Sequence, residues 1–353
     1  MKETIRVLIV DDSPLIRTIL NTMLEDAGGI QVVGQARDGE EAVSLAASLR
    51  PDVITMDIRM PRMNGLEATR QIMSTRPTPI VVLATSIYDA DMNIAFNAVA
   101  SGALTVVEKP KGLDPEDFEA VRDQVVGTIR MMSGVQLVSI LPGQGVASSE
   151  ARPILPLANR PLDGPVELIA MVASTGGPGT LRQILADLPA ELAVPIVVLQ
   201  RVTPGFGHGF ANWLRGTTAL DVAIAEQGHR LAPSQVVLAA EGRHLTIAPG
   251  GVVQLEQSEP VSGQRPSATR LFDSLAAAYG PTGLGIVLSG MGDDGIDGLE
   301  KLWKAGGHII AQDEDSCAVF EMPRLAIERG IVDAILPPAE IVREICRLNG
   351  SRM

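Results

Sequence analysis

The sequence predicts an α/β fold in two domains, each built on a parallel sheet with helices on both faces. Strand-length apolar runs alternate with segments of helical periodicity, which is the pattern of β-α-β units. The alternation occurs over residues 5–131 and resumes at Leu168, after a stretch rich in proline and glycine. A chain of 353 residues is also longer than one typical domain.

The first half alternates five expected strands with five expected helices. An apolar stripe at helical spacing runs along residues 14–27, and Gly28-Gly29 ends that helix. Asp38 is placed to cap the next helix. The expected strands are 5–10, 32–33, 53–56, 80–84 and 104–107, and the other expected helices lie around 42–46, 64–75, 89–101 and 115–131.

Polar side chains follow four of these strands. Asp11 and Asp12 follow the first strand, Asp57 the third, Thr85 the fourth and Lys109 the fifth. Carboxyl ends of parallel strands form the ligand-binding edge of such sheets, and three carboxylates there favour Mg²⁺. Asp57 could then attack a phosphoryl group, Lys109 and the metal could stabilise its charge, and Thr85 could bind it once attached. Any one of these acidic residues taken alone would be read as an ordinary turn residue, but the set on ordered strands favours a phosphoryl-transfer site.

These positions belong to longer motifs. The motifs are Asp11-Asp12, Asp57 followed by Met60-Pro61 and Asn64-Gly65, Thr85-Ser86, and Lys109-Pro110. With them, residues 4–131 resemble a response-regulator receiver domain. The resemblance implies a flavodoxin-like fold, phosphorylation of Asp57 by a partner histidine kinase and a rearrangement transmitted through Thr85. Val106 stands where the family often has an aromatic residue, so the aromatic part of that relay is not expected.

The second half begins after a predicted linker. Residues 133–165 lose periodicity and are punctuated by proline and glycine, although their apolar residues could pack on a domain. We therefore expect a first domain over 1–132, the linker over 133–165 and a second domain over 166–353. In the second domain the expected strands are 168–173, 195–200, 236–239, 284–288 and 308–311, the expected helices lie near 178–188, 206–215, 268–279 and 295–304, and a hairpin-rich insertion is expected around 236–255.

A candidate nucleophile follows the first strand of the second domain. Ser174 precedes Gly176-Gly177-Pro178, and proline suits a first helical turn, so backbone N–H groups of a helix N-terminus could hold an oxyanion there. A plain helix cap is one alternative. A dinucleotide-binding turn is another, but it needs a small residue where Arg182 stands. The glycine-rich loop 289–295 follows another strand and should bring Asp294 to the same edge.

Four motifs carry a second resemblance. They are Ala173 to Pro178, Arg265-Pro266-Ser267 with Leu271-Phe272, Leu288 to Gly295, and Ala311 to Glu314 with Met322-Pro323. With them, residues 167–347 resemble the catalytic domain of chemotaxis protein-glutamate methylesterases. The resemblance implies Ser174 as nucleophile, Asp294 as the residue that orients a histidine, oxyanion stabilisation by the Met291 backbone and a site lined by Thr175. It implies no cofactor in this domain, methyl-accepting chemoreceptors as partners, and hydrolysis of receptor glutamate methyl esters with deamidation of glutamine as a further activity.

The sequence departs from this family at one position. The family histidine directly follows a strand-ending glutamine, and here Arg201 follows Gln200. Arginine stays protonated and cannot accept the Ser174 proton, but it could form a salt bridge with Asp294. The sequence does not place His208, His229, His244 or His308 as a replacement base.

Two functions remain open from the sequence. One is a phosphorylation-regulated methylesterase of chemotaxis. The other is a phosphorylation-controlled binding protein whose hydrolase site is inactive. A methanol-release assay would separate them.

Composition excludes several other classes. The net charge of −13 argues against nucleic acid as a partner. No apolar run approaches the ~20 residues of a membrane span, and no signal peptide is recognisable, so we expect a cytoplasmic protein without membrane insertion. In that compartment Cys317 and Cys346 are expected to be reduced thiols.

Overall fold

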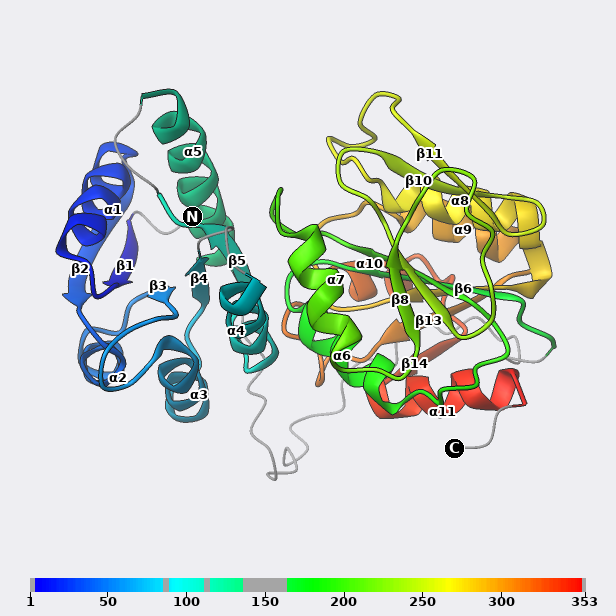
Figure 1. Ribbon diagram of the computed structural model, residues 1–353, viewed down its shortest axis with the longest axis horizontal. Coiled ribbons are helices and arrows are strands. Elements are labelled where there is room, and N and C mark those ends of the chain that lie inside the picture. Colours follow the sequence, from blue (N-terminus) through cyan, green and yellow to red (C-terminus); the bar gives the residue numbers. More distant parts are fainter. Residues whose placement is uncertain (1–3, 85–88, 111–114, 136–163, 351–353) are drawn as a thin grey trace. The chain divides into compact units, whose positions relative to one another are not determined.

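The computed structural model describes residues 4–84, 89–110, 115–135 and 164–350, and the chain divides near residue 140 into two compact units (Figure 1). Most of the predicted linker over 133–165 lies outside the described residues, as does Thr85. Among the described residues, no helix is both long and apolar enough to cross a bilayer.

The first unit is the predicted parallel five-stranded sheet, in the order β2-β1-β3-β4-β5. Helices α1 and α5 contact each other, while α2 contacts α3 and α3 contacts α4, which gives one helical layer on each face (Figure 1). The elements are β1 Ile5–Val10, α1 Pro14–Asp26, β2 Ile30–Ala36, α2 Gly39–Leu49, β3 Val53–Asp57, α3 Gly65–Thr75, β4 Ile80–Ala84, α4 Asp89–Ala100, β5 Thr105–Glu108 and α5 Pro115–Met132.

Local chemistry explains where these helices start. The predicted cap is confirmed, because the Asp38 carboxylate accepts from the Glu41 amide at 2.9 Å. Asn64 caps α3 in the same way, through the Glu67 amide at 2.9 Å. The order in which successive strands are added to the sheet reverses between β1 and β3. This switch point places Asp11, Asp12 and Asp57 next to one another.

The second unit contains a seven-stranded parallel sheet in the order β14-β13-β12-β6-β7-β9-β8 and a separate antiparallel hairpin, β10-β11. The elements are β6 Leu168–Ala173, α6 Gly177–Asp187, β7 Ile196–Gln200, α7 Gly207–Arg215, β8 Asp221–Ile224, β9 Gln235–Leu238, β10 His244–Ala248, β11 Val252–Glu256, α8 Ala268–Tyr279, β12 Gly283–Val287, α9 Ile296–Lys304, β13 His308–Gln312, α10 Met322–Glu328, β14 Ala334–Leu336 and α11 Pro338–Leu348, with a short 3₁₀ turn at Gly280–Thr282.

The predicted elements of this unit are present, and the structure adds others. The expected strand near 236–239 is β9, which joins the main sheet, whereas the hairpin of the insertion covers 244–256. The edge strands β8 and β14 and the helices α10 and α11 were not predicted from the sequence.

The core positions the site at a second switch point. Alternate residues of β6 (Leu168, Ala170 and Val172) pack in one apolar cluster with the leucines and phenylalanine of α8 and α9. Helices α6 and α11 contact each other on the other face (Figure 1). From β6 the chain continues to β7 on one side, while β12 lies on the other, so the loops after β6 and β12 face a common crevice.

Candidate active site and candidate phosphorylation site

Ser174 lies in the turn between β6 and α6, as predicted. Its amide donates to the Ser289 carbonyl at 3.0 Å, and its carbonyl accepts from the Gly177 amide and from Gln200 Nε2, both at 2.9 Å. The backbone is therefore fixed from three sides. The half-buried Ser174 hydroxyl makes no hydrogen bond within the part of the chain that the structure describes, so it is available to attack a ligand.

Close packing requires glycine at two positions, one in this turn and one in the facing loop after β12. A Cβ on Gly290 would lie 2.8 Å from Ser174 Cβ and 2.4 Å from Met322 Sδ. Gly176 has φ +78°, and a Cβ there would lie 2.7 Å from Ser289 Oγ. The Ser289 hydroxyl in turn donates to the carbonyl of the buried Thr175 at 2.8 Å. The loops after β6 and β12 are thus packed directly against each other.

Met291 follows Gly290 in this packed loop. Its amide makes no hydrogen bond among the described residues and could stabilise an oxyanion, the role predicted for it.

Asp294 is buried, but its carboxylate is committed to the start of α8. Oδ1 accepts from the Ser267 hydroxyl at 2.8 Å and from the amide and hydroxyl of Thr269, both at 3.1 Å, while Oδ2 accepts from the Ala268 amide at 2.8 Å. Ser267 caps α8 and belongs to the motif Arg265-Pro266-Ser267, whose contact with Asp294 is not predictable from the sequence. The expected salt bridge between Arg201 and Asp294 is wrong: no ion pair joins these two described residues, because the helix start already satisfies the carboxylate.

Arg201 instead contacts the loop after β12. Its Nη2 donates to the Met291 carbonyl at 2.9 Å and lies 3.7 Å from Met322 Sδ, while Nε is buried and has no partner among the described residues. Burial lowers the pKa of Arg201 from its ordinary value, and the Asp294 and Asp293 carboxylates act in the opposite direction. The arginine brings a cation to this edge but no proton acceptor.

No histidine takes the place of the missing base. His244 is buried with both ring nitrogens engaged, Nδ1 by the Ser267 amide at 3.2 Å and Nε2 by the Glu259 carbonyl at 3.0 Å. His229 bonds Gln235 at the start of β9, and His308 begins β13, so both lie at the amino ends of strands, away from Ser174.

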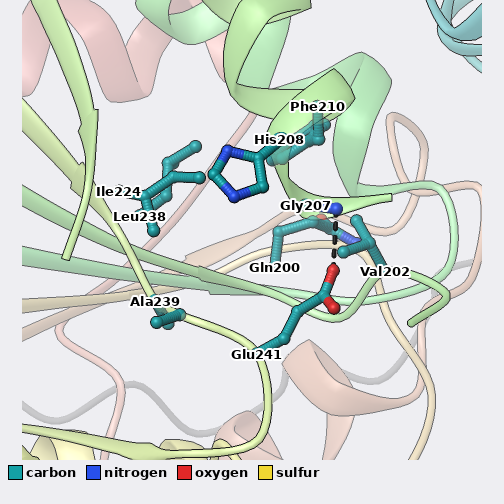
Figure 2. Close-up of a pocket in the computed structure, with 10 residues that line it drawn as sticks. Gln200, Val202, Gly207, His208, Phe210, Ile224, Leu238, Ala239 and Glu241 are labelled. Atoms are coloured by element: carbon teal, nitrogen blue, oxygen red, sulfur yellow. Dashed lines mark hydrogen bonds between the residues drawn. The ribbon is translucent and has the colours of Figure 1, made fainter. Parts of the chain in front are cut away.

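His208 lies nearest in topology, at the start of α7, but it faces a separate cavity (Figure 2). This cavity, of about 250 Å³, was not predicted. It lies beyond the carboxyl ends of β7, β8 and β9, and in Figure 2 the His208 ring lies beside Ile224 and Leu238. The Glu241 carboxylate on its rim accepts from the amides of Gly205 at 2.9 Å and Gly207 at 2.7 Å, which holds the loop before α7.

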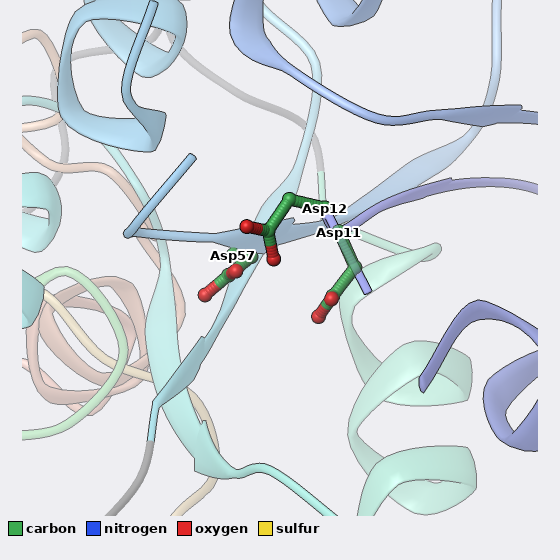
Figure 3. Close-up of side chains that lie close together, drawn as sticks. All are labelled: Asp11, Asp12 and Asp57. Atoms are coloured by element: carbon green, nitrogen blue, oxygen red, sulfur yellow. The ribbon is translucent and has the colours of Figure 1, made fainter. Parts of the chain in front are cut away.

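The three predicted aspartates of the first unit lie together at one edge of the sheet (Figure 3). Oxygen atoms of Asp11, Asp12 and Asp57 lie within 4.8 Å of one another. Lys109 Nζ lies 2.7 Å from Asp11 Oδ2 and 3.0 Å from Asp57 Oδ2. The Lys109 amide bonds the Ala84 carbonyl at 2.8 Å, so the end of β4 is adjacent, although the next residue, Thr85, lies outside the described residues.

Electrostatics in this cluster are unfavourable without a further cation. Burial raises the pKa of Asp57 to about 6; Lys109 opposes this rise and Asp11 adds to it. Burial likewise raises the pKa of Asp11, against the effect of Lys109. Burial lowers the pKa of Lys109, but Asp57 and Asp11 outweigh it and the net direction is upward. One ammonium therefore faces three carboxylates, two buried and one exposed to solvent, and such an oxygen-only set fits Mg²⁺.

Comparison with known proteins identifies both units. Residues 169–345 match the family model described as CheB methylesterase, and residues 7–120 match the model described as response regulator receiver domain. The chain is 41% identical over 335 residues to protein-glutamate methylesterase/protein-glutamine glutaminase 4 of Myxococcus xanthus, covering 95% of this chain and 94% of that one. It is 42% identical to the corresponding protein 3 of Anaeromyxobacter dehalogenans, covering 96% and 97%.

A solved structure agrees with the second unit. The CheB methylesterase catalytic domain of Thermotoga maritima superposes with a TM-score of 0.50 at 35% identity, covering 52% of this chain and 98% of that one.

Proposed function

The chain belongs to the CheB methylesterase family with an N-terminal receiver domain, and from this premise we propose that it is a phosphorylation-regulated protein-glutamate methylesterase and glutaminase. Its substrates would be glutamate methyl esters, and glutamine side chains, of methyl-accepting chemoreceptors in the cytoplasm. The products would be receptor glutamate with methanol or ammonia. The alternative of an inactive hydrolase site has no support in the comparisons, since both relatives carry the name of the enzyme.

The observation that carries this proposal is the free hydroxyl of Ser174 at the switch point between β6 and β12. Ser174 Oγ would attack the ester carbonyl, and the unbonded amide of Met291 would stabilise the resulting oxyanion. Collapse would release methanol and leave an acyl-enzyme, which water would hydrolyse to the free acid.

Arg201 is expected to slow this reaction, because it replaces a general base. Residue 201 cannot take the Ser174 proton, so that proton would pass to solvent. General-base assistance is worth on the order of 10²–10⁴-fold, so the reaction should be slow. The guanidinium nevertheless places positive charge beside the reacting carbonyl.

The receiver would supply regulation. Asp11, Asp12 and Asp57 would hold Mg²⁺, which would supply positive charge to offset these carboxylates and the incoming phosphoryl group. Asp57 would accept a phosphoryl group from a histidine kinase, with Lys109 stabilising its charge and Thr85 binding it afterwards. Phosphorylation of Asp57 would thereby control hydrolysis by the second unit.

Methanol release from methylated chemoreceptor tests this function. We expect release by the intact protein, an increase after treatment with acetyl phosphate and Mg²⁺, and loss in Ser174→Ala. Release that is unchanged in Ser174→Ala would remove the proposed nucleophile, and no release in any state would remove the activity.

A further inference from the structure

The Arg201 guanidinium is a partly buried cation that forms no ion pair with any described residue. One of its N–H groups donates to a neutral carbonyl, that of Met291, and the same nitrogen contacts the sulfur of Met322. Nε is buried and unpaired, and Nη1 has no hydrogen bond among the described residues. A guanidinium carries five N–H donors, so most of the Arg201 donors make no hydrogen bond to the described residues.

The two carboxylates that act electrostatically on Arg201 do not accept from these donors. Both carboxylate oxygens of Asp294 accept hydrogen bonds from residues 267–269. Asp293 is exposed, and neither aspartate forms an ion pair with Arg201. Burial still lowers the pKa of Arg201 in spite of both charges. Its charge is therefore incompletely compensated.

Gly292 lies beside this cation and places no side chain against it. Gly292 has φ +95°, and a Cβ built there would lie 3.7 Å from Arg201 Nη2 and 3.9 Å from Nη1. The N-terminus of the 11-residue helix α6 begins three residues after Ser174, and its dipole also favours an anion at this edge.

We propose that Arg201 makes the edge beside Ser174 a carboxylate-binding site, and that its ligand is a glutamate side chain of the receptor in the free-acid form. The forked donors of a guanidinium match a carboxylate, whereas a methyl ester and an amide are neutral and lose that charge-assisted pairing. The domain would then retain the product of its own reaction. The choice of ligand rests on the proposed function, but binding itself does not require turnover.

A binding experiment separates the three chemical forms. A helical peptide with one central glutamate is prepared as the free acid, the methyl ester and the glutamine form. Binding to the full-length Ser174→Ala protein is measured by fluorescence anisotropy, with and without acetyl phosphate and Mg²⁺. We expect the free acid to bind at least about tenfold more tightly than the other two forms in at least one of these states, as is typical of one charge-assisted contact.

Arg201→Gln in the same background keeps a donor for the Met291 carbonyl and should abolish this preference. Arg182→Gln on α6 removes the same charge from an exposed position and should preserve it. Free acetate is the competitor that distinguishes recognition of a bare carboxylate from recognition of the peptide. Equal binding of all three forms in both states, or a preference that survives Arg201→Gln, would overturn the proposal.

A second measurement needs no substitution at residue 201. Phenylglyoxal modifies arginine, and mass spectrometry reports the adduct on Arg201. The free-acid peptide should protect Arg201, and the glutamine peptide should not. Equal protection by both would also contradict the proposal. Because these tests use a protein without its nucleophile, their failure is distinct from a failure of methanol release.

Discussion

The Asp294 carboxylate accepts a hydrogen bond from the Ser267 hydroxyl at 2.8 Å, and this contact joins the loop after β12 to the N-terminus of α8. The same carboxylate holds two backbone amides of that helix start. Asp294 is thus an anchor for a helix as well as a residue of the active-site loop. In this structure it does not orient a catalytic base.

We therefore expect Asp294→Ala to destabilise the second unit by about 2–4 kcal/mol, because buried N–H groups lose their acceptor at about 1–3 kcal/mol each. Both tryptophans, Trp213 and Trp303, belong to this unit, so fluorescence during urea unfolding reports on it alone. The exposed neighbour provides the control, and Asp293→Ala should change stability by less than about 0.5 kcal/mol. Equal effects of the two substitutions would refute the anchoring role.

Arg201→His should raise methanol release from methylated receptor, because a neutral imidazole can accept the Ser174 proton. The gain should be on the order of 10² or less, since Asp294 is held by residues 267–269 and is not free to fix the imidazole tautomer. Initial rates of the two proteins at equal phosphorylation provide the measurement. Adding Ser174→Ala to this variant should return the rate to background. If the wild-type protein were as fast as Arg201→His, a different group would have to act as the base.

Asp57→Asn should abolish labelling by a small phosphodonor, because the attacking carboxylate oxygen is lost. Labelling of the wild-type protein should require Mg²⁺ and stop when the metal is chelated. Lys109→Gln is expected to slow labelling while leaving the attacking oxygen in place, since Lys109 lies 3.0 Å from Asp57. Undiminished labelling of Asp57→Asn would move the phosphorylation site elsewhere.

The raised pKa of Asp57 predicts a pH-dependent cost to the first unit in the absence of metal. The folded carboxyl has a pKa of about 6 against 3.8 when unfolded, so the folded state binds the proton more tightly. Protonation of Asp57 therefore stabilises the folded first unit. This stabilisation is fully present below about pH 4 and is lost as the pH rises to about 6. At pH 7, Asp57→Asn should stabilise the unit by up to about 3 kcal/mol, the equivalent of a shift of about two units.

Hydrogen exchange in the buried strands β3 and β4 measures this effect within the first unit. The difference between Asp57→Asn and the wild-type protein should vanish at pH 4. Mg²⁺ should reduce the difference at pH 7, because the metal would neutralise the carboxylates. A constant difference across pH 4–7 would show that Asp57 ionisation is not its cause.

Much of the fold follows from the sequence because strand-length apolar runs alternate with helical stripes. That alternation forces parallel strands, and parallel strands bring their carboxyl ends to one edge. The cluster of Asp11, Asp12, Asp57 and Lys109 could be predicted for this reason, as could the placement of Ser174 after β6. The edge strands β8 and β14 could not, since each has three or four residues and pairs on one side only.

The sequence by itself determined which chemical groups meet at each edge, including the replacement of a base by Arg201. Only the tertiary structure decided how those groups pair. Asp294 could have bonded Arg201 or the start of α8, and both partners are far from it in sequence. The helix start prevails because it offers several donors in fixed positions around one buried carboxylate, leaving the Arg201 guanidinium with the carbonyl of Met291.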